Sequence, residues 1–212
     1  ECTDSPVEGD YIRYQSGGYE SSYTTEKTEN GWNNALKIVP KYYSYLEYEE
    51  KVTEKVREII NGFGFGEKTT DYDKVRAVYD YVCRNVTYDR IHVRNENYYL
   101  RSTSYAALIW DNATCQGYCV TIYRLLRELG INCRIITGKA EGESPDNLHA
   151  WNIIELGKTY FCADATWDAG KESYDYFLKG SSEFTDHTPG AGFTTADFMA
   201  AYPVAEKSYT EQ

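Results

Sequence analysis

Cysteine and histidine are the residues of this chain best suited to nucleophilic chemistry, and both are scarce. The 212 residues include six cysteines and three histidines, so a site that needs both types can be built in few ways. Cys115 is the most informative cysteine, because Thr114-Cys115-Gln116-Gly117 predicts the start of a helix, where the dipole and unpaired N–H groups favour a thiolate. Gly117 leaves room for a substrate or another element to approach the thiol. Taken alone, a cysteine at such a place is more often structural than reactive.

A second pair of residues follows from the register of a predicted hairpin. Two strand candidates, 149–156 and 159–166, are joined by Gly157-Lys158, which suits a two-residue II′ turn. Counting outward from this turn places His149 and Asp164 on one face as diagonal neighbours, roughly 7–8 Å apart at the backbone. A carboxylate bonded to one imidazole nitrogen leaves the other free to take a proton from a thiol. A structural cross-strand hydrogen bond is the alternative, and a one-residue slip would separate the pair.

Hydrophobic periodicity predicts the elements that must hold these residues in place. We expect helices at about 48–60, about 71–83 and 115–129, and a further strand at 131–137. Asn61-Gly62 is expected to stop the first helix, a capping box of Thr70 and Asp73 to start the second, and Gly130 to end the third. Helices followed by antiparallel strands predict an α+β fold and not a doubly wound α/β fold.

Composition excludes several classes of partner. The chain has 22 basic and 33 acidic residues and a net charge of -11, which argues against binding nucleic acid or anionic lipid. The densest apolar stretch, 106–110, is far shorter than the roughly 18 residues of a membrane helix, so no membrane span is expected. No Cys/His cluster or acidic loop predicts a metal, and no cofactor is expected. His92 and His187 are interpreted as surface or structural groups, and the cysteines other than Cys115 mainly as buried free thiols.

The N-terminal quarter differs from the rest. Residues 1–50 are rich in Tyr, Ser, Thr, Gly and Glu without a sustained helical period, and they are interpreted as an extended or loop-rich arm packed on the core. Residues 51–212 then form the second, catalytic unit. A mature exported chain without its leader would begin like this. We therefore expect an extracellular or cell-surface protein, and we expect a monomer.

The candidate residues lie in motifs that resemble the transglutaminase-like superfamily of cysteine acyltransferases and peptidases. The likeness covers about residues 70–180 and runs through four blocks: Tyr88-Asp89, Cys115-Gln-Gly-Tyr118, His149-Ala-Trp-Asn152 and Asp164-Ala-Thr-Trp-Asp168. The order Cys, His, Asp is similar to that of the bacterial extracellular branch. The resemblance implies a papain-like core in which the cysteine helix packs on an antiparallel sheet. It also implies Cys115 as nucleophile, His149 as general base and acid, and Asp164 as the residue that orients His149.

These roles predict a thiol enzyme that acts on peptide or protein amides through a Cys115 thioester. A cysteine peptidase or deamidase is expected, with cell-wall peptide as one candidate substrate. A protein-crosslinking transglutaminase is the first alternative. A non-catalytic domain that binds peptide or glycan is the second.

Aromatic residues complete the predicted site. The backbone N–H of Cys115 is the expected first oxyanion donor, and the Tyr88 hydroxyl is the candidate for the second. Tyr118, Trp151 and Trp167 are candidates for the walls of the substrate cleft. A packing role is the alternative for each of these four side chains.

Overall fold

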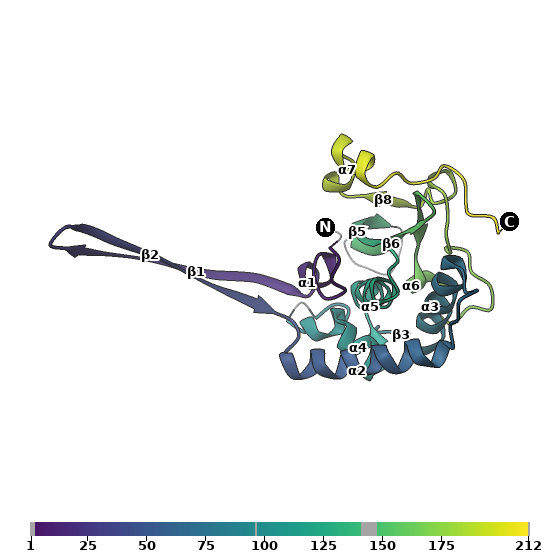
Figure 1. The fold of residues 1–212 in the computed structure, drawn as a ribbon, viewed down its shortest axis with the longest axis horizontal. Helices are drawn as coiled ribbons and strands as arrows, with labels where there is room; N and C mark the ends of the chain where they lie inside the picture. Colours follow the sequence, from purple (N-terminus) through teal and green to yellow (C-terminus); the bar gives the residue numbers. More distant parts are fainter. Residues whose placement is uncertain (1–2, 96, 141–147, 212) are drawn as a thin grey trace.

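The computed structural model describes residues 3–95, 97–140 and 148–211, which form a body of helices and sheet from which one long hairpin projects (Figure 1). In chain order the elements are α1 (Asp10–Arg13), β1 (Ser16–Thr28), β2 (Gly31–Tyr42), α2 (Leu46–Phe63), α3 (Asp71–Asn85), β3 (Thr87–Tyr88), η1 (Tyr99–Ser102), α4 (Ser104–Ile109), β4 (Asn112–Ala113), α5 (Cys115–Glu128), β5 (Cys133–Ala140), β6 (Leu148–Leu156), β7 (Thr159–Ala163), α6 (Ala165–Asp168), η2 (Ser181–Glu183), β8 (His187–Pro189), η3 (Ala191–Phe193) and α7 (Ala196–Ala201).

A four-stranded antiparallel sheet with the strand order β7-β6-β5-β8 lies at the centre of the body. α5 packs on one face and the C-terminal segment with α7 covers the other (Figure 1). Side chains alternate between two cores, because neighbours on a strand point to opposite faces: Ile135 and Ile154 belong to the core around α5, and Ile136 and Ile153 to the second core. The predicted α+β fold is confirmed.

The predicted helices are present, with one difference at the end of α2. Thr70 and Asp73 form the expected capping box at the start of α3: the Thr70 N–H donates to the Asp73 carboxylate at 2.8 Å, and the Asp73 N–H donates to the Thr70 hydroxyl at 3.1 Å. Asn61-Gly62 does not stop α2, which continues to Phe63 and ends where Gly64 adopts a left-handed φ of 65°. The glycine that terminates the helix is therefore the later one. Among the described residues, no helix is long and apolar enough to cross a membrane.

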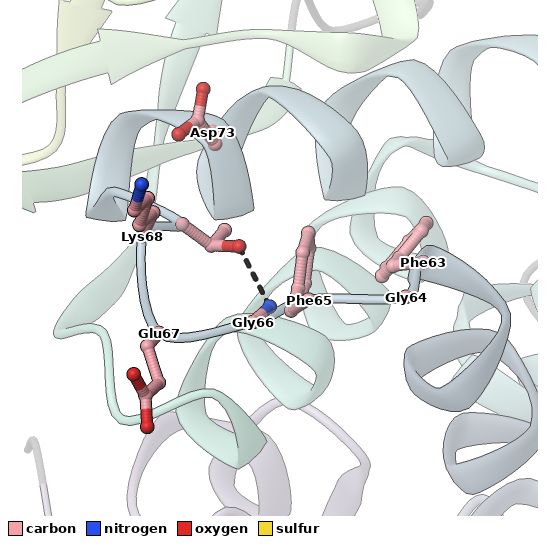
Figure 2. A pocket seen from close by; sticks show the side chains of 8 residues that line it. Phe63, Gly64, Phe65, Gly66, Glu67, Lys68 and Asp73 are labelled. Carbon is pink, nitrogen blue, oxygen red and sulfur yellow. Dashed lines mark hydrogen bonds between the residues drawn. The ribbon is translucent and has the colours of Figure 1, made fainter.

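The connection between α2 and α3 is short and partly aromatic. The Gly66 N–H donates to the Thr69 hydroxyl at 2.9 Å, and Phe63 packs against Phe65 (Figure 2). A shallow pocket in this turn shares no lining residue with the cleft beside His149, as far as the described residues show. The turn therefore takes no part in the candidate site.

Gly117 permits the close packing of α5 against the preceding segment. A Cβ atom there would lie 2.6 Å from the Cβ of Ala113 and 3.0 Å from the carbonyl oxygen of Arg101. The sequence analysis expected Gly117 to leave room either for a substrate or for another element. The structure favours the second role, because the preceding segment occupies this space.

The expectation that the N-terminal arm packs on the core is only partly correct. Asp10, Tyr11 and Gln15 are buried against the body, but every residue of β1 after Ser16 and every residue of β2 is exposed. The two strands pair only with each other, so no third element covers them and the hairpin extends away from the body (Figure 1). The boundary expected after residue 50 falls inside α2, which begins at Leu46.

Candidate active site

Cys115 is the first residue of α5, and its side chain is partly buried. The preceding residue, Thr114, anchors the start of the helix: its N–H donates to the Arg101 carbonyl at 2.9 Å, and its hydroxyl lies 3.0 Å from that of Ser102. Because α5 is 14 residues long, the positive end of its dipole favours negative charge on the sulfur. The structure therefore places the thiol where the sequence predicted it.

The predicted register brings His149 and Asp164 together. Leu156 pairs with Thr159 and Asn152 with Ala163, so the turn has two residues, and Gly157 has a φ of 71°. His149 lies near the start of β6, and Asp164 directly follows β7. His149 Nε2 is 2.7 Å from the Oδ2 oxygen of Asp164, which confirms the predicted contact.

His149 interacts with both Asp164 and Cys115. Burial lowers the pKa of His149, but hydrogen bonds and charge interactions with Asp164 and Cys115 outweigh burial and raise it to about 10. Since Nε2 faces Asp164, Nδ1 is the nitrogen left for the thiol. A thiol, an imidazole and a carboxylate in this order can support nucleophilic attack with proton transfer.

The Asp164 carboxylate is buried and accepts four hydrogen bonds. The Oδ1 oxygen accepts from the N–H groups of Thr166 (2.9 Å) and Trp167 (3.3 Å), because Asp164 caps the short helix α6. The Oδ2 oxygen contacts His149 Nε2 at 2.7 Å and His187 Nε2 at 3.1 Å. Burial raises the pKa of this carboxyl. The hydrogen bonds and charges of both histidines lower the pKa by a larger amount, so it ends below its ordinary value. Asp164 is therefore held as a carboxylate.

His187 is the residue that the sequence analysis missed. Its side chain is fully buried, and its ring packs on Phe184 with centroids 3.9 Å apart. The interpretation as a surface or structural group beside Asp186 is wrong in placing it outside the site. The three-residue strand β8 brings it there by pairing with β5, where Ala140 is opposite His187. Such a short strand has no periodicity that the sequence could reveal.

A cleft of about 630 Å³ opens beside His149. Trp167, a candidate for the cleft wall, lines it, and so do Tyr176 and Tyr88, the candidate for the second oxyanion donor. Tyr118 does not: it is fully buried in the core, and its hydroxyl donates to the Val86 carbonyl at 2.5 Å.

The prediction for Trp151 is also wrong in its location. Trp151 is buried on the face of β6 that packs against the C-terminal segment, where it contacts the rings of His149 and His187 and lines a separate apolar pocket. The strand register determines which residues lie on the same face of β6 as Trp151. Which element packs against that face depends on the rest of the fold.

The remaining cysteines and His92 match their expected structural roles. Cys83, Cys119, Cys133 and Cys162 are buried and Cys115 is partly buried, and none of these five cysteines is in a disulfide. Cys2 lies outside the described residues. Burial raises the pKa of Cys162 to about 12, and it also raises the pKa of Cys119, with a further contribution from nearby acidic groups. His92 is partly exposed and pairs with Asp89 at 2.9 Å.

His149, Asp164 and His187 are also donors of the types that bind transition metals, and their donor atoms lie within 4.8 Å of one another. Both Nε2 atoms, however, are at hydrogen-bond distance from the same carboxylate oxygen, Oδ2 of Asp164. A metal would have to displace the protons that join these atoms. The described geometry fits proton sharing better than coordination.

Comparison with known proteins agrees with this architecture. The chain is 27% identical over 137 residues to the human kyphoscoliosis peptidase, covering 61% of this chain and 20% of that protein. It is 26% identical over 112 residues to the mouse kyphoscoliosis peptidase, covering 49% of this chain and 17% of that protein. The chain thus spans about a fifth of the length of these relatives.

A solved structure described as a TGase superposes with a TM-score of 0.50 at 21% identity, over 78% of this chain and 49% of that one. At this identity the match supports the fold. The model of the transglutaminase-like superfamily matches residues 57–165, about half of the chain, which includes Cys115, His149 and Asp164. The chain belongs to the transglutaminase-like superfamily.

Proposed function

We propose that this protein is a thiol-dependent acyl-transfer enzyme that acts on peptide or protein amides. The observation that supports the proposal best is the sequence of contacts among three side chains. Cys115 lies at the start of α5, His149 interacts with Cys115, and the buried Asp164 carboxylate lies 2.7 Å from His149 Nε2. Cys115 is the nucleophile, His149 the acid and base, and Asp164 the residue that orients His149.

The raised pKa of His149 favours a protonated imidazole before substrate binds. With the pKa near 10, the imidazolium is the main form at neutral pH, so His149 can give a proton to the leaving amine. The sequence predicted a base that removes the thiol proton during attack. In the proposed reaction the thiolate is the reactive form of Cys115.

The reaction follows from these protonation states. The Cys115 sulfur attacks the amide carbon, a C–S bond forms, and the carbonyl oxygen becomes an oxyanion. The His149 Nδ1–H proton moves to the amide nitrogen as the C–N bond breaks, which leaves a thioester. Water then gives a proton to His149 and attacks the thioester carbon, and the carboxylic acid and the thiolate–imidazolium pair are restored.

The oxyanion is stabilised by donors at the start of α5. The backbone N–H of Cys115 is the first donor that we assign, because it belongs to the first turn of the helix. Tyr88 is the second candidate, since it lines the cleft next to His149.

Hydrolysis is favoured over crosslinking, and the names of the curated relatives as peptidases point the same way. A crosslinking transglutaminase, in which a lysine amine replaces water, is the second candidate. A non-catalytic peptide- or glycan-binding domain is the third.

Extracellular or cell-surface location and a bacterial cell-wall peptide substrate stay predictions. The first can be checked by localising a tagged chain, and the second by offering purified cell-wall peptides.

Selective alkylation tests the assignment of the nucleophile. Iodoacetamide near pH 7 is expected to modify Cys115 first, as located by mass spectrometry, because an ion-paired thiolate reacts faster than buried thiols. Cys162, buried and with its pKa raised to about 12, is the internal control. Equal modification of both cysteines, or modification only after unfolding, would remove the basis of the proposal.

A second assay separates the three candidate functions. The chain is incubated with a peptide library in the presence and absence of a fluorescent primary amine. New peptide termini indicate a peptidase, loss of a side-chain amide without cleavage a deamidase, and amine incorporation a transglutaminase. Binding without turnover, together with an unreactive Cys115, would indicate the non-catalytic domain.

A further inference from the structure

His187 joins the buried Asp164 to a second carboxylate. Its Nε2 atom lies 3.1 Å from Asp164 Oδ2, and its Nδ1 atom lies 2.7 Å from Asp186 Oδ1. The Asp186 carboxylate also accepts a hydrogen bond of 2.6 Å from the Tyr176 hydroxyl. Cys115, His149, Asp164, His187, Asp186 and Tyr176 thus form one continuous chain of polar groups.

Both carboxylates on His187 are ionised. For Asp164, burial raises the pKa but the two histidines lower it more. For Asp186, burial also raises the pKa, and the bonds to Tyr176 and His187 lower it more. An ionised carboxylate only accepts hydrogen bonds, so His187 Nε2 contacts Asp164 as a donor. The His187 ring lies 5.4 Å from the ring of His149 between centroids, and the two imidazoles share one carboxylate oxygen.

We propose that His187 is a positioning residue that shares the Asp164 carboxylate with His149 and so leaves His149 able to give up its proton to a leaving amine. The proposal rests on the function proposed above. The N–H groups of Thr166 and Trp167 hold the other oxygen of Asp164, so this carboxylate stays in place when His187 is removed. The expected consequence of removal is therefore electrostatic: an undivided negative charge binds the His149 proton more strongly.

Two substitutions at His187 and one control test this assignment. His187→Phe keeps the aromatic packing against Phe184 and removes both hydrogen bonds. His187→Gln keeps a neutral donor. His92→Gln is the matched control, because His92 also pairs with a carboxylate, that of Asp89, outside the site.

Imidazole proton–nitrogen NMR spectra are the readout, since the chain has only three histidines. In the wild type, His187 Nε2 is expected to carry the proton that it donates to Asp164. The His149 signals are expected to titrate about one pH unit higher in H187F, with a smaller change in H187Q and none in H92Q. A His187 Nε2 without a proton in the wild type, or an unchanged or lower His149 titration in both His187 variants, would overturn the proposal.

Alkylation of Cys115 in the wild type keeps the two proposals distinct. If Cys115 is not selectively alkylated by iodoacetamide, the proposed function fails. If Cys115 is selectively alkylated but the His149 titration does not rise in either variant, only the role of His187 fails. Thermal unfolding of each variant identifies a purely structural role, in which the melting temperature falls and the His149 titration stays unchanged.

The β1–β2 hairpin supports a second, independent inference. Cross-strand pairing places Tyr23 opposite Leu36, Ser21 opposite Ile38 and Lys27 opposite Trp32, so the apolar side chains share one face. Tyr19, Tyr23, Trp32, Leu36 and Ile38 on this face are each more than half exposed. An apolar face of this size on the surface marks an interaction site.

The charge distribution is compatible with a second copy of this chain as the partner. The hairpin residues 16–42 contain three glutamates and three lysines, so the net charge of -11 belongs to the rest of the chain. We propose that the face binds the same face of a second copy, with the two hairpins antiparallel. The acidic bodies then lie at opposite ends, separated by roughly 40 Å of strand, several times the Debye length of about 8 Å at physiological salt.

The area available implies a weak dimer. Five large side chains that each bury on the order of 100 Å² give roughly 1,000 Å² over two copies, the lower limit for a specific interface. A weak, concentration-dependent dimer is therefore expected. This inference departs from the monomer expected from the sequence.

Sedimentation velocity from about 1 to 200 µM tests the dimer. The wild type is expected to shift from monomer to dimer with concentration, and Trp32→Ser and Ile38→Ser are each expected to weaken association at least about 10-fold. Val39→Ser is the matched control, because Val39 pairs with Glu20 on the opposite face. A monomer at every concentration, or equal weakening by V39S, would exclude a second copy as the occupant; binding of another protein or of a glycan to that monomer would count against the proposal.

Discussion

Two ion pairs of equal length show how differently the body and the hairpin are built. Arg134 Nε contacts the Asp10 carboxylate at 2.6 Å with both side chains buried, and Lys41 Nζ contacts the Glu20 carboxylate at 2.6 Å with both more than half exposed. Burial raises the pKa of Asp10, but Arg134 and the Ile135 N–H lower it more. A buried charge in the body is stable only when it is paired and hydrogen-bonded, because water cannot reach it. An exposed charge on the hairpin can exchange a lost partner for water.

The same contrast holds for apolar residues. The body buries Trp151 completely and places the imidazole rings of His149 and His187 next to it, whereas the hairpin exposes Trp32. The buried polar groups at Asp164 depend on one another because each has few alternative partners. The two hairpin strands are almost wholly exposed and, among the described strands, pair only with each other. Substitutions in the two regions should therefore differ in kind as well as in size.

The largest effect is expected for Asp164→Asn in the polar chain of the body. The variant removes the charge that orients His149 and stabilises its imidazolium, so turnover of the peptide identified by the library assay should fall about 10²–10⁴-fold. The His149 titration should also move to lower pH. Asp89→Asn, at the carboxylate that pairs with the partly exposed His92, is the control. Equal turnover in D164N and D89N would contradict the proposed role of Asp164.

The buried ion pair should be costly to break, and the exposed one should not. Asp10→Asn leaves Arg134 buried without its carboxylate, and we expect a loss of about 3–5 kcal/mol in the free energy of unfolding by urea. Glu20→Gln on the hairpin should leave the unfolding transition unchanged within error. If E20Q destabilises the chain as much as D10N, the hairpin is coupled to the body and the comparison fails.

The pH dependence of stability should also originate in the body. The folded-state pKa of His149 is raised to about 10 from an ordinary value of 6.5, so its contribution to stability is complete below about pH 6.5 and is lost as pH rises toward 10. Urea unfolding of the wild type and of His149→Gln across this range should give a smaller decline in the variant. Parallel declines would show that His149 keeps its ordinary pKa.

The smallest effect is expected from two glycines within helices. Gly117→Ala should cost about 1–3 kcal/mol, because the new Cβ would lie 2.6 Å from Ala113. Gly62→Ala in α2 has nothing within 4 Å of its Cβ, and it should stabilise the chain by about 0.5–1 kcal/mol. Thermal unfolding of both variants measures the difference, and a neutral G117A would mean that the packing before α5 can adjust.

Local features of the chain were predictable from the sequence. The capping box at Thr70, the helix that begins at Cys115 and the two-residue turn at Gly157 each depend on neighbours in the chain, and each is present. The even spacing of Tyr19 and Tyr23 and of Leu36 and Ile38 is also typical of strands, in which alternate residues share a face. The absence of a helical period in this segment does not by itself distinguish a strand from a loop.

The sequence alone determined that His149 and Asp164 meet, because a two-residue turn sets the register of the strands on either side of it. Tertiary structure decided the rest of the site. His187 reaches Asp164 through the pairing of β8 with β5, Tyr118 is buried in the core, and Trp151 packs in the second core. These positions depend on contacts between distant segments, and the energy of such contacts is set by burial and hydrogen bonding that no local pattern encodes.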